Sequence, residues 1–297
     1  VRGVCWNNSP NPTVNNDTTI NGSGTGNFSS TIENLIPNNT YYVRAYATNS
    51  NGTGYGDELT FALTQFVSVP DQNFEQALIN LGYDDVVDGF VFNEYISSVN
   101  TLNVQNKNIS DLTGIEGFTA LTYLSCTDNQ LTSLDVSNNT ALTYLDCLNN
   151  QITSLDVSNN TALTYLSCTA NQLTSLDVTQ NTALVRLYCD YNQITSIDVS
   201  NNTALTYFNC TANQLTSLDV SHNTALVWLR CAYNQLTCLN IKNGNNTNID
   251  LFADNNNLTC IEVDDPNWAT NNWTTANGII DAGTTFSTNC NYPAGCF

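Results

Sequence analysis

Residues 121–141 read L-T-Y-L-S-C-T-D-N-Q-L-T-S-L-D-V-S-N-N-T-A, and this stretch returns along the chain with few changes. Further copies begin at intervals of 21 residues, at Leu142, Leu163, Leu184, Leu205 and Leu226. This period is too short for a propeller blade or a helical-pair repeat, and it suits a solenoid coil. The sequence therefore predicts a stack of coils, with a variant coil over 102–120 and an irregular seventh coil beginning near Asn248.

Each copy carries regularly spaced apolar residues, which in the first are Leu121, Leu124, Cys126, Leu131, Leu134 and Val136. One copy alone cannot bury enough apolar surface to offset the entropy of ordering its backbone, so neighbouring copies must stack. The core L-x-x-L-x-C-x-x-N-x-L resembles the leucine-rich-repeat signature. That resemblance implies an α/β-type solenoid dominated by β and turns, right-handed, with a parallel sheet on its concave face.

The cysteines fall into two groups. Six recur at one position of the repeat: Cys126, Cys147, Cys168, Cys189, Cys210 and Cys231. We expect these to be free, buried thiols, because they point inward and in-register thiols of parallel strands rarely meet the disulfide torsion. Near the end of the chain we expect at least one disulfide, and hence an oxidising compartment. The candidates, which permit three complete pairings, are Cys238, Cys260, Cys290 and Cys296.

Two polar columns accompany the cysteines. The first consists of Asn129, Asn150, Asn171, Asn192, Asn213, Asn234 and Asn256, whose buried amides should bond the backbone of their own coil or the next. The second consists of Asp135, Asp156, Asp177, Asp198 and Asp219. These carboxylates are interpreted as turn caps, with calcium binding as the weaker alternative. No cofactor is implied.

The repeats, assigned to 102–263, need closure at both ends. A helical N-terminal cap is predicted over 66–101, where Asp71 can begin an amphipathic helix and Gly82 can end it. A C-terminal cap is predicted over 264–297, and its large apolar side chains are Trp268, Trp273 and Phe286.

Residues 1–63 form a different kind of segment. Alternating runs at 3–6, 40–49 and 56–61 predict strands that Asn/Gly turns separate. They resemble the later strands of a fibronectin type III domain, which implies a partial β-sandwich. The variant coil at 102–120 resembles the repeats of internalins, the bacterial surface adhesins. Together these features resemble leucine-rich-repeat surface proteins of the Bacteroidetes, which implies type IX secretion and a location outside the cell, at the outer membrane or on the cell surface.

The charge balance excludes several classes of function. The chain has 26 acidic and 6 basic residues and a net charge of −20, which repels nucleic acids and anionic membranes. No apolar run is long enough for membrane insertion. The one histidine, His222, stands in a predicted turn, and no nucleophile–base pair, phosphate loop or metal motif is apparent. We expect a binding module and not an enzyme, as a monomer or as part of a larger multidomain chain.

The outward strand positions differ from copy to copy, whereas the rest of the repeat hardly changes. Tyrosine recurs in the first outward column, and Arg186 and Trp228 interrupt it. Because Tyr, Trp and Arg concentrate binding energy, we predict a ligand-binding patch on coils four to six of the concave face. The patch consists of Arg186, Tyr188, Asp190, Tyr191, Tyr207, Trp228, Arg230 and Tyr233.

Two ligand classes fit this composition. Aromatic rings with Asp and Asn suit sugars, and aromatic rings with Arg suit a protein, so we predict adhesion to a protein or glycan on a surface. Two alternatives are a passive spacer that displays neighbouring domains and a carbohydrate-binding accessory module of a secreted enzyme. Acidic neighbours such as Asp190 are expected to hold both arginines in place.

Overall fold

The computed structural model describes residues 1–36, 39–62 and 65–296. The chain forms two compact units, one of Val1–Phe66 with Phe92–Glu94 and one of Val67–Val91 with Tyr95–Phe297. Residues 63 and 297, at which the first and last predicted segments end, lie outside the described residues.

The described residues of the first unit form one antiparallel sheet in the order β2-β1-β3-β4. The three predicted strands are confirmed as β1 (Arg2–Asn7), β3 (Thr40–Asn49) and β4 (Gly52–Ala62), and β2 (Asp17–Thr18) adds a short edge. The thiol of Cys5 is buried against the carbonyl oxygen of Pro12, at 3.4 Å. One sheet is half of a sandwich, so the likeness to a fibronectin type III domain stays a sequence prediction.

Ahead of the repeats, β5 (Phe66–Ser68) pairs with β6 (Phe90–Phe92), and helix α1 (Gln72–Leu81) lies between them in the sequence. The predicted ends of the helix are confirmed: the Asp71 carboxylate accepts two backbone N–H groups, and Gly82 adopts the left-handed conformation with φ 81°. The buried carboxylate of Glu75 accepts three more N–H groups, two from the loop before β6 and one from Phe90, its first residue. A short helix, α2 (Asn93–Ile96), follows.

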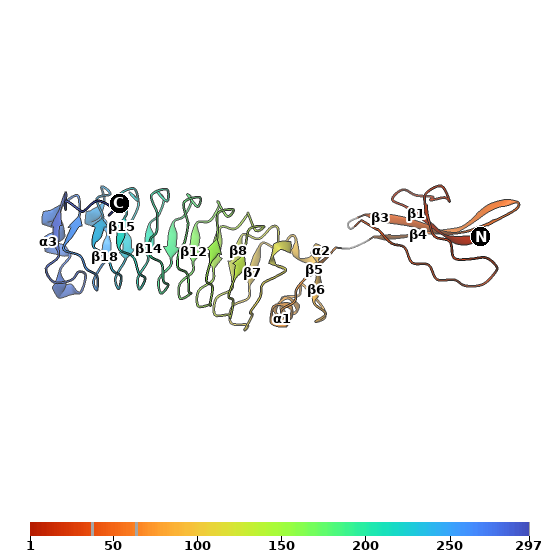
Figure 1. The fold of residues 1–297 in the computed structure, drawn as a ribbon, viewed down its shortest axis with the longest axis horizontal. Coiled ribbons are helices and arrows are strands. Elements are labelled where there is room, and N and C mark those ends of the chain that lie inside the picture. Colours follow the sequence, from red (N-terminus) through yellow and green to blue (C-terminus); the bar gives the residue numbers. More distant parts are fainter. Residues whose placement is uncertain (37–38, 63–64, 297) are drawn as a thin grey trace. The chain divides into compact units, whose positions relative to one another are not determined.

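The solenoid carries one parallel sheet of eight strands, whose order in space follows the chain (Figure 1). Equivalent residues are in register, so Tyr144 lies opposite Tyr123 on one side and Tyr165 on the other. We call the solvent-facing side of this sheet the concave face. Its strands are β7 (Thr101–Asn103), β8 (Tyr123–Ser125), β10 (Tyr144–Asp146), β12 (Tyr165–Ser167), β13 (Arg186–Tyr188), β14 (Tyr207–Asn209), β16 (Trp228–Arg230) and β18 (Asp250–Phe252).

Behind this sheet the inward side chains form one core, which includes the six cysteines of the repeat. All six are free and at most 1% exposed, as predicted, and Ala253 takes their place in the seventh coil. Desolvation raises the pKa of these thiols, to about 12 for Cys231. A buried neutral thiol in this column acts as a small apolar side chain.

Asparagine amides join the coils to one another. Asn171 accepts the N–H of Ile152 and donates to the carbonyl oxygens of Cys147, Cys168 and Thr169, at 3.0–3.2 Å. Its side-chain amide therefore bonds its own coil and the preceding one, not the next one. A second column of buried asparagines was not predicted from the sequence. Their side-chain amides also donate to backbone carbonyls of earlier coils. They are Asn139, Asn160, Asn181, Asn202 and Asn223.

The opposite side of the coils carries two parallel sheets with fewer strands. They join β9 (Leu134–Asp135) to β11 (Leu155–Asp156), and β15 (Ser217–Asp219), β17 (Cys238–Asn240), β19 (Cys260–Glu262) and β20 (Thr285–Ser287) in that order. Three 3-10 turns, η1 (Ile115–Gly117), η2 (Asn246–Asn248) and η3 (Thr275–Asn277), complete the connections.

Helix α3 (Pro266–Asn272) begins at the Asp265 cap and belongs to the C-terminal end of the stack, where Trp273 is 3% exposed within the core. Two disulfides, Cys238–Cys296 and Cys260–Cys290, bind the last residues to β17 and β19. The prediction of at least one disulfide here is confirmed, and the pairing is one of the three that the sequence permits.

Alkylation of the native, unreduced protein followed by mass spectrometry should leave the ladder cysteines unmodified and residues 238–296 without a free thiol. Burial and a raised thiol pKa both suppress the reactive thiolate in the ladder. Unfolding without reduction should then expose the ladder thiols to the reagent. Ready labelling of Cys168 in the native state, or free thiols at the C-terminal cysteines, would contradict this account.

Candidate functional site

The concave face presents two columns of outward side chains that the parallel register aligns. The first runs through Tyr123, Tyr144, Tyr165, Arg186, Tyr207, Trp228 and Asp250, and the second through Ser125, Asp146, Ser167, Tyr188, Asn209, Arg230 and Phe252. The strand spacing of about 4.8 Å brings side chains of neighbouring coils into contact. These columns are the frame on which the predicted ligand-binding residues stand.

Three tyrosines form a stack at the beginning of the first column. The ring centroids of Tyr123 and Tyr144 lie 4.3 Å apart at 12°, and those of Tyr144 and Tyr165 lie 4.1 Å apart at 9°. Each ring therefore covers a face of its neighbour, and both faces of Tyr144 are covered. Desolvation, together with a hydrogen bond to Tyr165, raises the pKa of Tyr144. The stack offers ring edges and hydroxyl groups to a ligand.

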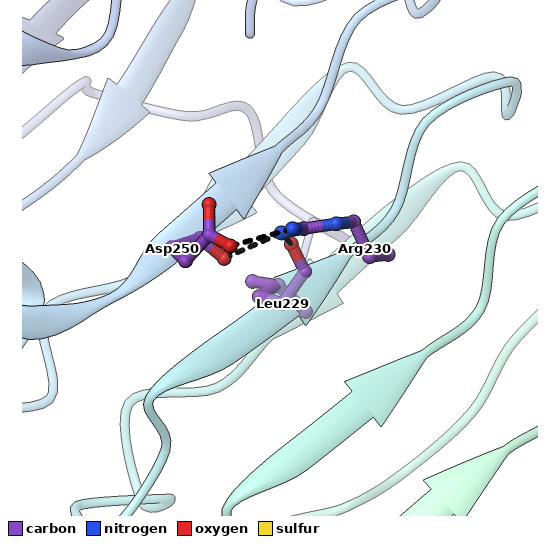
Figure 2. Close-up of polar contacts among 3 residues, drawn as sticks. All are labelled: Leu229, Arg230 and Asp250. Atoms are coloured by element: carbon purple, nitrogen blue, oxygen red, sulfur yellow. Dashed lines mark hydrogen bonds and ion pairs between the residues drawn. The ribbon is translucent and has the colours of Figure 1, made fainter.

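Arg230 lies on β16, toward the C-terminal end of the concave face, and several groups surround it. Its guanidinium is 4.3 Å from the ring centroid of Trp228 and 4.2 Å from that of Phe252. It donates to the Asp250 carboxylate at 2.6 Å and to the backbone oxygen of the same residue at 2.7 Å (Figure 2). A weaker bond, at 3.3 Å, reaches the carbonyl of Leu229. Because these groups hold it from several sides, the guanidinium is fixed in one orientation.

The patch is continuous across coils four to six. The Arg186 guanidinium lies 4.9 Å from the ring centroid of Tyr207, and that ring lies 6.2 Å from Trp228. Tyr188 is 6.3 Å from Trp228 on one side and 5.6 Å from Tyr165 on the other. Aromatic and cation–π contacts thus join five of the eight predicted residues to one another and to the tyrosine stack: Arg186, Tyr188, Tyr207, Trp228 and Arg230.

Tyr191 and Tyr233 flank the patch at the bend that follows the strands. They are 61% and 59% exposed, and both have φ of 53°. The whole column is left-handed, and where it holds Asp128, Asn149 or Asn255 the residue suits that conformation. A tyrosine gains nothing from the backbone there, and its exposed ring has no packing role to explain it.

One predicted role is wrong. Asp190, expected to hold an arginine, is 7% exposed and instead accepts the Thr169 hydroxyl at 2.6 Å. Arg230 pairs with Asp250 and Arg186 contacts a ring. Asp250 and Phe252 are the members of the network that the predicted patch omitted, although the repeat register places both in the two outward columns.

The aspartate column on the other side of the coils acts as turn caps, which confirms the favoured interpretation. The carboxylate of Asp135 accepts the N–H of Ser137 at 2.9 Å, and the four later aspartates repeat this bond two residues on. Hydrogen bonds to Ser or Thr lower the pKa of four of the five, Asp135, Asp156, Asp177 and Asp198. Among the described residues, no three His, Cys, Asp or Glu side chains are grouped to hold a metal ion.

Calcium should therefore have no effect on stability. The expected result is the same melting temperature in excess CaCl₂ and in excess EDTA at constant ionic strength, because one oxygen of each carboxylate is already a turn cap and neighbouring carboxylates do not converge on one point. Magnesium serves as the control for non-specific screening of the net charge. A melting temperature that rises with calcium and not with magnesium would restore the metal interpretation.

Comparison with known proteins places the fold among internalins. No family model matches the chain. Internalin J of Listeria monocytogenes is 38% identical over 70 residues, which are 24% of this chain and 8% of that protein. The functional domain of InlJ from Listeria monocytogenes, described as including a cysteine ladder, is 35% identical with a TM-score of 0.53, over 67% of this chain and 52% of that one.

Internalin C2 of the same species has a TM-score of 0.59 at 22% identity, over 76% of this chain and all of that one, and shows the fold alone. The chain spans about half of the InlJ domain and a small part of Internalin J. It has an internalin-like leucine-rich-repeat fold with 21-residue repeats. These relatives come from Listeria and lend no support to the predicted Bacteroidetes origin or to the fibronectin type III likeness.

Proposed function

We propose that this chain is a protein-binding module and that its partner contacts the concave face at coils four to six. The observation that carries the proposal is the network in which Arg186, Tyr207, Trp228 and Arg230 contact one another in sequence. Arginines among aromatic rings are typical of the residues that dominate protein interfaces, and Arg230 is held in one orientation. The contact residues proposed are Arg186, Tyr188, Asp190, Tyr191, Tyr207, Trp228, Arg230 and Tyr233.

The covered ring faces favour a protein over a glycan. A sugar stacks on an open aromatic face, but Tyr144 is covered on both faces and Arg230 lies over Trp228 and Phe252. Within this network the groups open to a ligand include ring edges, hydroxyl groups and guanidinium N–H groups, which suit the mixed polar surface of a protein. Glycan recognition is thus the second candidate, with the exposed rings of Tyr191 and Tyr233 as its best support.

An extracellular location fits the proposal. Two disulfides join the C-terminal residues to the last coils, and disulfides persist in oxidising compartments. The internalin-like fold supports a place at a bacterial cell surface or in the surrounding medium. In the part of the chain that the structure describes, no helix has the length and apolar character needed to cross a bilayer.

The proposal is tested by screening the purified chain in parallel against an array of extracellular proteins and an array of glycans. We expect saturable binding to a protein and none to glycans, and loss of that binding in the double variant Trp228→Ala, Arg230→Ala. Binding to a glycan that the double variant loses would support the second candidate. No binding on either array would favour the passive spacer and overturn the proposal.

A further inference from the structure

Asp190 is a buried carboxylate on an otherwise exposed face. It stands in the third outward column, where the coils on either side carry the uncharged Thr169 and Thr211 and where the other acid is Asp254, three coils later. The residue is 7% exposed, and its carboxylate accepts the Thr169 hydroxyl at 2.6 Å. Neither of its oxygens is a buried atom without a partner. The carboxylate is therefore desolvated and hydrogen-bonded, but it has no cation beside it.

That arrangement costs stability in the free protein. Burying a charge is unfavourable unless the charge is paired and hydrogen-bonded. Desolvation accordingly raises the pKa of Asp190 above its ordinary value. Because the native state then holds the proton more tightly than the unfolded state, ionisation of Asp190 lowers the free energy of unfolding at neutral pH. A site that retains such a cost is a candidate for a functional role.

The chain's own cations do not pair with this carboxylate. Across residues 1–36, 39–62 and 65–296 the one ion pair joins Arg230 to Asp250. Arg186, on the strand β13 that precedes Asp190, lies over the ring of Tyr207. A metal ion is also a poor fit, since one carboxylate supplies too few ligands and no cluster of three surrounds it among these residues. Within the described residues the ionised carboxylate thus has no cationic partner, and a ligand can supply one.

We propose that Asp190 is the specificity-determining anion of the concave face and receives a Lys or Arg side chain of the protein partner. Tyr188, two residues before it, and the exposed Tyr191 beside it supply aromatic surface suited to the stem and charge of such a side chain. This inference rests on the proposed function and deepens it: the partner presents a basic residue opposite coil four. The net charge of −20 attracts such a partner from a distance.

The test uses the full chain and two isosteric variants, Asp190→Asn and Asp254→Asn, the second of which lies in the same column three coils later. Each removes one negative charge, so long-range attraction falls equally. Nα-acetyl-lysine amide is titrated while the backbone amide signals of Ala170 and Tyr191 are followed by NMR, because the N–H of Ala170 bonds the Asp190 carbonyl. The uncharged control ligand is Nα-acetyl-norleucine amide.

We expect saturable shifts in the wild type and in the matched control Asp254→Asn, and affinity at least about tenfold weaker in Asp190→Asn, as for loss of a charge-assisted bond. The Asp190→Asn protein should also unfold at a higher urea concentration than the wild type. Wild-type shifts that do not saturate, equal lysine affinity in Asp190→Asn, or a lower urea midpoint would overturn the inference. If a protein partner binds through Trp228 and tolerates Asp190→Asn, the proposed function stands and this inference fails. If lysine binds at Asp190 but no protein partner binds the chain, this inference stands and the proposed function fails.

Discussion

Alanine at both Trp228 and Arg230 should weaken binding of the protein partner by about 30-fold or more. Truncating a central aromatic anchor typically costs about 2 kcal/mol, which is about 30-fold in affinity at 25 °C. The cost here includes the loss of support for the neighbours, since the Arg230 guanidinium contacts Trp228 and Phe252 and pairs with Asp250. Isothermal titration calorimetry on the folded variant measures the effect.

The matched control is the double variant Tyr123→Ala, Ser125→Ala, which changes the same two columns in the first coil. We expect it to bind within about threefold of the wild type, because rim positions contribute little. Circular dichroism must show both variants folded. If the first-coil pair abolishes binding and the Trp228 and Arg230 pair does not, the partner lies at the other end of the tyrosine stack and the assignment is wrong.

The largest effect on stability is expected from Asn171→Ala. The substitution leaves the buried N–H of Ile152 without a partner. The carbonyls of Cys147, Cys168 and Thr169 each lose one donor but keep another, from Asn150, Asn192 and the N–H of Asn149. A buried donor left unsatisfied costs about 1–3 kcal/mol, and the free energy of unfolding should fall by about that amount. Urea denaturation followed by far-UV circular dichroism checks this.

Asn159→Ala is its control, because this exposed amide makes a single bond, of 3.3 Å, to the Ser137 carbonyl. Its effect should stay within about 0.5 kcal/mol. Because each coil depends on its neighbours, loss of Asn171 should also split the transition into two steps, one for each side of the third coil. An Asn171→Ala protein with the wild-type midpoint would show that the ladder amides are not what joins the coils.

Most of the fold follows from the period of the repeat. A spacing of 21 residues sets the register of every coil, and register alone places Tyr123 opposite Tyr144 and Arg186 opposite Tyr207. The ends of α1 follow from the chemistry of Asp71 and Gly82. These features are predictable because they depend on backbone conformation and spacing, which local sequence encodes strongly.

Side-chain partnerships are harder to predict. Register places Asp250 one coil beyond Trp228, but which acid Arg230 pairs with depends on rotamers that the whole neighbourhood selects. The column that begins at Asn139, which the sequence analysis did not single out, does leave a signal in the sequence. Every coil that has this buried position holds Asn there, whereas the position just before it changes to Gln180 and His222 in two coils. Constancy at one of two neighbouring polar positions is the mark of burial.

Photo-crosslinking locates the partner most directly. A p-benzoylphenylalanine residue replaces the exposed Tyr191 in one variant of the full chain and the exposed Asn201, in the turn later in the same coil, in another. Each is irradiated with the protein partner identified by the array. Binding at the concave face of coils four to six predicts a covalent adduct from position 191 and none from position 201. An adduct from position 201 alone would contradict it.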